Sequence, residues 1–230
     1  MKFFGQPADY SEMLQRVFFF SIVTGLICTF LLASASPLIQ EIVDSLKTEV
    51  DFGPIKSIKA MYILIPGVIA LLSRIIKLHD RISDLLWIRM IFDTKFFLYP
   101  LCQRAGVPLT EEIKAKLRKT RDDSMYQTVY KYAGYKKPQI DDQLVRTAAD
   151  NWGWFWGFVE SSFLFIVTTV ILAYLHKWDY VIKLLYIILF EIFLMLILSY
   201  ACIRSARPQV DAILNDTNRK SEIQGYFQSL

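Results

Sequence analysis

Residues that commonly carry chemistry are scarce in this chain of 230 residues. It has three cysteines (Cys28, Cys102 and Cys202) and two histidines (His79 and His176). The odd number of cysteines argues against a disulfide framework, and none has the spacing of a metal knuckle or a redox pair. The sequence offers no phosphate-binding glycine loop, no nucleophile elbow and no metal-ligand spacing. We therefore expect no metal, no cofactor and no enzymatic activity.

The sequence also lacks the period-two alternation of half-buried strands, and it has no internal repeats. Long apolar runs stand in their place, and 54% of the residues are hydrophobic. The two longest runs, 153–175 and 180–203, are separated only by a short polar turn. About 20 apolar residues in a helix cross the hydrocarbon core of a bilayer. These runs therefore predict an antiparallel pair of transmembrane helices.

Two further spans are expected nearer the start of the chain, at about 17–36 and 58–77. The first could be a secretory signal, but its length and the acidic residues before it favour a membrane helix. The second is short, and Pro66-Gly67 should kink it, so a re-entrant segment is the alternative. The resulting fold class is an all-α integral membrane protein with four transmembrane helices and a helical module inserted between the second and the third.

These spans divide the chain into four parts. Residues 1–78 hold the first helix pair, 79–151 the helical cytoplasmic module, 152–204 the transmembrane hairpin and 205–230 a cytoplasmic tail with a loose end. Within the module, Thr110 before two glutamates is a typical helix start. The region between the first two spans should be a polar connection with a short surface helix, broken at Gly53-Pro54.

Positive charges close to the span ends set the orientation of a membrane protein. They concentrate after the second and fourth expected spans, at Arg74, Lys77, Arg81, Arg89, Arg204 and Arg207. This bias places both termini and the helical module in the cytoplasm and predicts a multi-pass protein of the cell membrane. Tryptophans favour the headgroup level, which makes interfacial anchors of Trp152, Trp154, Trp156 and Trp178.

Two acidic residues interrupt the apolar runs. Glu191 lies near the middle of the fourth span, and Glu160 lies about two turns into the third. A carboxylate in hydrocarbon is costly unless it is protonated, paired or facing water. We expect these residues to form either an ion or proton path or a hydrogen-bonded helix interface, with Arg74 as a potential partner of Glu160.

A basic run in the middle module is the second candidate site. Its members are Lys114, Lys116, Arg118, Lys119 and Arg121, with acids on both sides. The plain interpretation is a solvated helix face, or one that touches anionic headgroups. The functional interpretation is a surface for a soluble protein partner, with a nucleotide or nucleic acid as a weaker option.

Three functions remain open from the residues. The first is a non-enzymatic effector, channel or membrane anchor whose module receives a signal or binds a soluble partner, for instance in prokaryotic defence or stress. The second is a small ion- or proton-coupled transporter component that uses Glu191. The third is a membrane-embedded enzyme at the cytoplasmic interface with His79 and Asp80 as an acid/base pair. Small residues at Gly25, Ala33, Gly67, Ala70, Gly153, Gly157 and Ala173 suit close helix contacts and suggest a homo-oligomer in the lipid bilayer.

Overall fold

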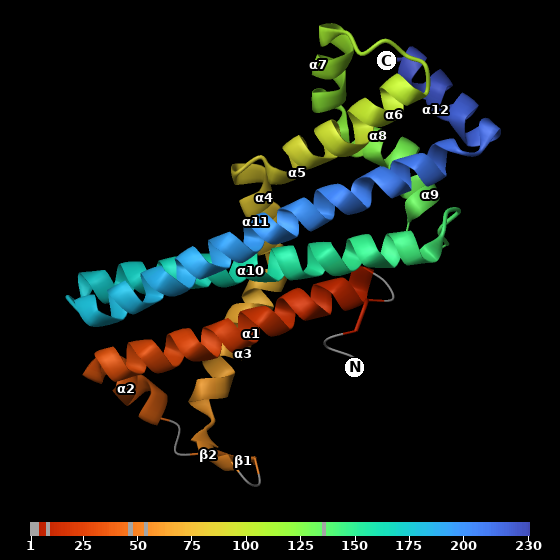
Figure 1. Ribbon diagram of the computed structural model, residues 1–230. Helices are drawn as coiled ribbons and strands as arrows, with labels where there is room; N and C mark the ends of the chain where they lie inside the picture. Colours follow the sequence, from red (N-terminus) through yellow and green to blue (C-terminus); the bar gives the residue numbers. More distant parts are fainter. Residues whose placement is uncertain (1–4, 8–9, 46–47, 53–54, 135–136) are drawn as a thin grey trace. The chain divides into compact units, whose positions relative to one another are not determined.

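A computed structural model describes residues 5–7, 10–45, 48–52, 55–134 and 137–230. These residues fold almost entirely as helices, as the sequence predicts (Figure 1). They form two compact units. The first, here called the apolar unit, comprises Leu14–His79 and Gly153–Ile197. The second, the polar unit, comprises Met1–Met13, Asp80–Trp152 and Leu198–Leu230.

Three helices are long and apolar enough to cross a membrane. They are α1 (Tyr10–Ala35), α10 (Asp142–Tyr174) and α11 (Trp178–Leu214). A fourth candidate consists of α3 (Met61–Ile75) and α4 (Leu78–Leu85), which pass the same test together but are bent by 58°. The described residues therefore contain three candidate spans, or four if the bent pair counts as one.

The bend in that pair lies after the expected proline kink. Pro66 is inside α3, which continues to Ile75, and the break follows at Lys77. Lys77 has a backbone φ of 51°, in the left-handed region that commonly ends helices. The second expected span is thus shorter than 58–77, because its apolar helix stops two residues before a left-handed residue.

A small β-ribbon precedes α3, and this is a departure from the predicted all-α fold. The helix α2 (Pro37–Asp44) matches the expected surface helix and is followed by β1 (Glu49–Phe52) and β2 (Ile55–Lys59). The strands pair antiparallel, with Glu49 opposite Lys59 and Val50 opposite Ile58. The expected break at Gly53-Pro54 lies outside the described residues. Strands this short give almost no periodic signal, which is why the sequence did not reveal them.

The apolar unit has its hydrophobic core where α1, α10 and α11 meet. Its centre is a cluster of buried side chains: Cys28, Ala35, Phe165, Leu172, Val181, Leu184 and Ile188. Glycines bring helices close elsewhere in this unit. A Cβ at Gly157 would lie 2.9 Å from the Phe20 ring, and one at Gly25 would lie 3.1 Å from Pro66 Cβ. Two of the small residues singled out in the sequence therefore serve helix contacts within one chain.

The polar unit is built from short helices. In chain order after α4 these are α5 (Ile88–Phe92), η1 (Asp93–Leu98), α6 (Tyr99–Arg104), α7 (Glu111–Lys119), α8 (Arg121–Met125), η2 (Tyr126–Tyr130) and α9 (Lys131–Ala133). The segments η1 and η2 are π-helices, which are rare and often mark functional positions. Thr110 caps α7 as expected, since its hydroxyl accepts the Ile113 N–H at 3.3 Å.

The C-terminal residues belong to the polar unit and differ from the loose end that the sequence indicates. Helix α12 (Thr217–Gln228) begins at Asp216, whose side chain accepts the Arg219 N–H at 2.9 Å. Ile223 and Phe227 are each 1% exposed. Helix α12 packs against α6 and η2. Two buried apolar side chains spaced by four residues hold this helix in place.

Candidate functional site

Glu160 of α10 is hydrogen-bonded at both carboxylate oxygens inside the apolar unit. Its Oε2 accepts the hydroxyls of Ser21 on α1, at 2.7 Å, and of Ser73 on α3, at 2.8 Å. Its Oε1 accepts the backbone N–H of His79 at 3.2 Å and lies 3.2 Å from the His79 Nδ1. Glu160 is 3% exposed. The carboxylate therefore joins α1, α3, α4 and α10 at one point.

Glu191 of α11 has a parallel arrangement. Ser161 donates to its Oε1 at 2.6 Å, and Ser162 donates to its Oε2 at 2.7 Å. The Ser161 hydroxyl also lies 2.8 Å from the Thr24 hydroxyl on α1. Both carboxylate oxygens are again satisfied by hydroxyls, in an environment of apolar helices.

The two groups of polar side chains lie on the same helices. Ser21 and Thr24 are three residues apart on α1, which places them on one face. Glu160 and Ser161 are consecutive on α10. We call the combined set the carboxylate row: Ser21, Thr24, Ser73, His79, Glu160, Ser161, Ser162 and Glu191. Hydroxyls both donate and accept, so within each of the two groups a carboxyl proton can be shared with hydrogen-bonded neighbours.

A buried acid also lies in the polar unit, at a position that no sequence pattern marks as a site. Asp93, the first residue of η1, is 6% exposed. Its Oδ2 lies 3.7 Å from Arg121 Nη1, and it has no hydrogen-bond partner in the part of the chain that the structure describes. Arg89 also faces this acid, donates to Asp80 at 2.8 Å and hydrogen-bonds Tyr130.

Burial raises the pKa of Asp93 to about 6, although the positive charges of Arg89 and Arg121 act in the opposite direction. Desolvation disfavours the charged form of a carboxyl group, and the nearby Asp122 adds to this effect. Asp93 thus titrates much closer to neutral pH than an exposed aspartate does. Arg89 is four residues before Asp93, but Arg121 is 28 residues after it, so no local pattern marks the whole cluster.

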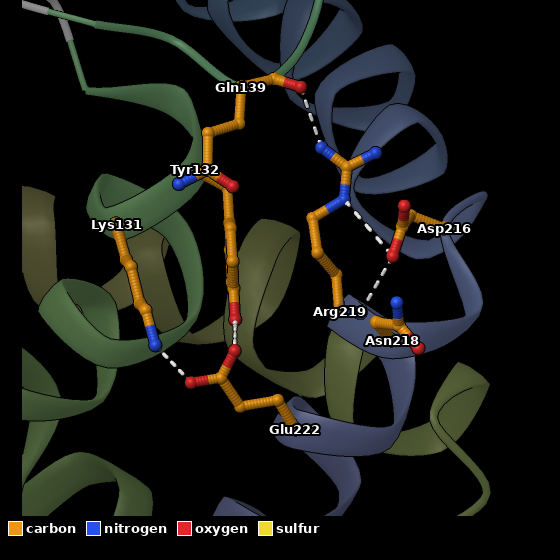
Figure 2. Close-up of a pocket in the computed structure, with 7 residues that line it drawn as sticks. All are labelled: Lys131, Tyr132, Gln139, Asp216, Asn218, Arg219 and Glu222. Atoms are coloured by element: carbon orange, nitrogen blue, oxygen red, sulfur yellow. Dashed lines mark hydrogen bonds and ion pairs between the residues drawn. The ribbon is translucent and has the colours of Figure 1, made fainter.

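A surface pocket of about 450 Å³ lies between α9 and α12 in the polar unit (Figure 2). On one side Glu222 accepts the Tyr132 hydroxyl at 2.6 Å and pairs with Lys131. On the other side Arg219 donates to the Gln139 carbonyl at 2.7 Å and lies 4.0 Å from Asp216. Hydrogen bonds from Lys131 and Tyr132 hold the pKa of Glu222 below its usual value. The charges that line the pocket are thus already paired and serve to hold α12.

Comparison with known families assigns the chain as a whole. Residues 9–228 match the model of the YmfE protein family. This chain belongs to the YmfE protein family. The match covers almost all of both compact units, so the carboxylate row and the Asp93 cluster both lie within it. No curated protein and no solved structure matches the chain.

Arg74 does not lie beside Glu160, where the sequence predicts a potential partner. It is exposed, and its guanidinium lies 5.8 Å from the centre of the Phe18 ring. Among the described residues, the ionisable partner of Glu160 is His79 rather than Arg74. Asp80, the neighbour of His79 in the sequence, pairs with Arg89 at 2.8 Å. The expectation missed His79 because the left-handed residue Lys77 redirects the chain just before it.

The expected tryptophan anchors separate into two classes. Trp152 packs edge-on against Phe92 at 4.4 Å, and Trp154 packs against Phe20 at 5.5 Å. Trp156 is 5% exposed and packs edge-on against Phe155, with the His79 ring 6.1 Å away. Trp178 is 58% exposed, in keeping with an interfacial role. The other three rings pack within the chain, and the buried Trp156 differs from the expected anchor because its ring fills space beside the carboxylate row.

Three members of the basic run have acidic partners. Lys114 pairs with Glu111 at 2.7 Å, Lys116 pairs with Glu112 at 3.3 Å, and Arg121 turns toward Asp93. Arg118 and Lys119 are exposed on α7. In the described part of the chain, no group of three or more His, Cys, Asp or Glu residues could hold a metal ion.

Proposed function

We propose that this protein is a non-enzymatic membrane protein of the channel or transporter class, in which the carboxylate row takes up and passes protons. The observation that carries the proposal is the pair of buried glutamates, each hydrogen-bonded at both oxygens, within helices apolar enough to span a bilayer. Ionisable residues at such positions are costly and usually mark ion or proton pathways.

The chemistry of the row supports proton transfer better than the passage of a hydrated ion. Thr24 and Ser161 lie within hydrogen-bond distance, and either hydroxyl can donate. Their hydroxyl hydrogens can rotate, so the Ser161 hydroxyl can donate either to Glu191 or to Thr24. His79 offers a further proton site against Glu160, because a proton on either Nδ1 or Oε1 makes a favourable contact.

The proposed topology has four crossings with both termini and the polar unit on the cytoplasmic side of the cell membrane. The bent pair α3–α4 supplies the fourth crossing, and the arginines close to the span ends support the orientation. We also propose a homo-oligomer. Gly67 supports it, because a Cβ there would meet nothing within 4 Å and its helix face is open to a close neighbour.

A second candidate function is a signal-receiving effector or anchor whose polar unit binds an acidic soluble partner. Its support is the exposure of Arg118 and Lys119, which make no ion pair among the described residues. Reversing both charges should weaken co-purification of such a partner in a salt-dependent way. Lys114 and Lys116 are matched controls, because their charges are already paired; equal loss in both double variants would refute a specific site.

The proton proposal is tested by flux into liposomes. Glu191→Gln and Glu160→Gln keep the shape of the side chain but cannot ionise, so purified variants should assemble normally and lose proton flux under an imposed membrane potential. Glu41→Gln, an exposed acid on α2, is the matched control and should behave as wild type. Wild-type flux in both glutamate variants would refute the proposal.

A further inference from the structure

Three consecutive apolar side chains project from the corner between α4 and α5. Leu85, Leu86 and Trp87 are 78%, 59% and 65% exposed. We call these residues the α4–α5 corner. Ile91, one turn into α5, is also exposed, at 46%. Isolated exposed apolar residues are common, but a contiguous set that includes a tryptophan indicates an interaction surface.

The backbone at this corner favours glycine over tryptophan. Trp87 has a φ of 57°, in the left-handed region. Its N–H bonds the Asp84 carbonyl at 3.3 Å, and its own carbonyl accepts the Ile91 N–H at 2.9 Å, so it ends one helix and begins the next. Glycine is the usual residue at such a helix end. A large aromatic residue in a strained conformation points to a role for its side chain outside the turn itself.

Packing among the described residues leaves most of the Trp87 ring exposed. The chain has five tryptophans, and Trp152, Trp154 and Trp156 pack against other aromatic rings. Trp87 and Trp178 are the two that are exposed. Trp178 is the first residue of α11 and lies at the turn between two apolar helices. Its exposure is therefore explained by a position at the membrane interface.

The corner is close along the chain to a group buried in the apolar helices. Helix α4 contains His79, which bonds Glu160 of the candidate span α10. Leu85 lies six residues further along α4, or about 9 Å at about 1.5 Å per residue. Exposed cations accompany this stretch: Lys77 precedes α4 and Arg81 lies on it, together with one exposed acid, Asp84. Tryptophan, leucine and flanking cations are the composition of segments that lie at the membrane surface.

We propose that the α4–α5 corner inserts into the headgroup–acyl boundary of an anionic lipid bilayer and anchors the junction between α4 and α5 there. Trp87 and Leu86 enter the boundary, while the long side chain of Arg81 extends toward the headgroups. This role goes beyond proton transfer, because it requires only the corner residues and the membrane. A second copy of the chain or a soluble partner on the same residues would be the competing occupants.

The test measures the depth of a spin label in vesicles. The whole protein, carrying Trp87→Cys or, as a second site, Leu86→Cys, is reconstituted in vesicles of phosphatidylcholine and phosphatidylglycerol. Lys119→Cys, on the exposed face of α7, is the matched control. The unsubstituted protein serves as a labelling blank, because its three native cysteines are buried. Collisions of the label with lipid-soluble oxygen and with a water-soluble nickel chelate are compared.

At positions 86 and 87 the ratio of oxygen to nickel accessibility should be several-fold higher than at position 119. A ratio equal to that at position 119 would place the corner in water and overturn the proposal. Low accessibility to both reagents would show that protein covers the corner, and this too would overturn it. Because the readout is depth, the result is independent of any loss of proton flux.

Discussion

The two compact units stabilise buried acids in opposite ways. In the apolar unit, Glu160 and Glu191 accept hydroxyl or N–H donors at every oxygen. In the polar unit, Asp93 has arginines nearby but an Oδ2 without a hydrogen-bond donor among the described residues. Hydroxyl and N–H dipoles in direct contact surround the two glutamates, whereas arginine charges at longer range act on Asp93.

This difference shows what each kind of environment allows. Serine and threonine fit among apolar helices and can satisfy an acid without adding a net charge. Arginine requires water or a partner, which Arg89 finds in Asp80 and Tyr130, and Arg121 in Asp93 and Asp122. Hydrogen bonds fix the geometry of the carboxylate row. Asp93 interacts instead with the charges of Arg89 and Arg121, which are less directional, and its pKa is raised to about 6.

The largest effect should come from removing Glu160. Glu160→Ala leaves the hydroxyls of Ser21 and Ser73 and the imidazole of His79 without their shared acceptor. Leaving a buried donor without its acceptor costs about 1–3 kcal/mol for each group. Thermal unfolding in detergent should show a large loss of stability, and Glu160→Gln should lose less because it keeps an acceptor oxygen. Equal, small losses in both would show that the row does not hold the helices together.

A second, smaller effect should distinguish Asp93 by its pH dependence. The rise of its pKa from 3.8 to about 6 corresponds to about 3 kcal/mol. The folded state binds the proton more tightly than the unfolded state does, so this group stabilises the fold as pH falls from about 7 to about 4. Asp93→Asn should remove that pH dependence, as measured by the difference between variant and wild-type unfolding profiles. Parallel profiles would contradict the assignment.

The smallest of the three effects concerns helix contacts around the row. Gly157→Ala places a Cβ 2.9 Å from the Phe20 ring and should destabilise the apolar unit by about 1–3 kcal/mol. Gly225→Ala, inside α12, is the matched control, because a Cβ there meets nothing within 4 Å. It should be neutral or stabilising by up to about 1 kcal/mol, since alanine favours helix more than glycine. Unfolding temperatures in detergent compare the two variants, and a larger loss at Gly225 would contradict the described packing.

The sequence was informative where a signal is local. Apolar runs of sufficient length predicted α1, α10 and α11, and Thr110 predicted the start of α7. The presence of Glu160 and Glu191 within apolar helices identified both as residues that need partners. Their cost in hydrocarbon is a property of the single residue and can be read without a structure.

The partners themselves depend on long-range contacts. Ser21 and Glu160 are 139 residues apart, and Asp93 meets Arg121 across a loop, two helices and a π-helical segment. The identity of His79 as the partner of Glu160 follows from the left-handed turn at Lys77, which non-glycine residues seldom adopt. The β-ribbon before α3 was missed for a different reason, since its strands have only four and five residues.

The central claim, that the carboxylate row takes up protons, is tested most directly by infrared difference spectroscopy on the protein in lipid. A pH step should change the carbonyl-stretch band of protonated carboxylic acids in the wild type. The account predicts that Glu160→Gln and Glu191→Gln each remove part of this change, while Glu41→Gln leaves it intact. An unchanged carboxylic band in both glutamate variants would contradict the claim.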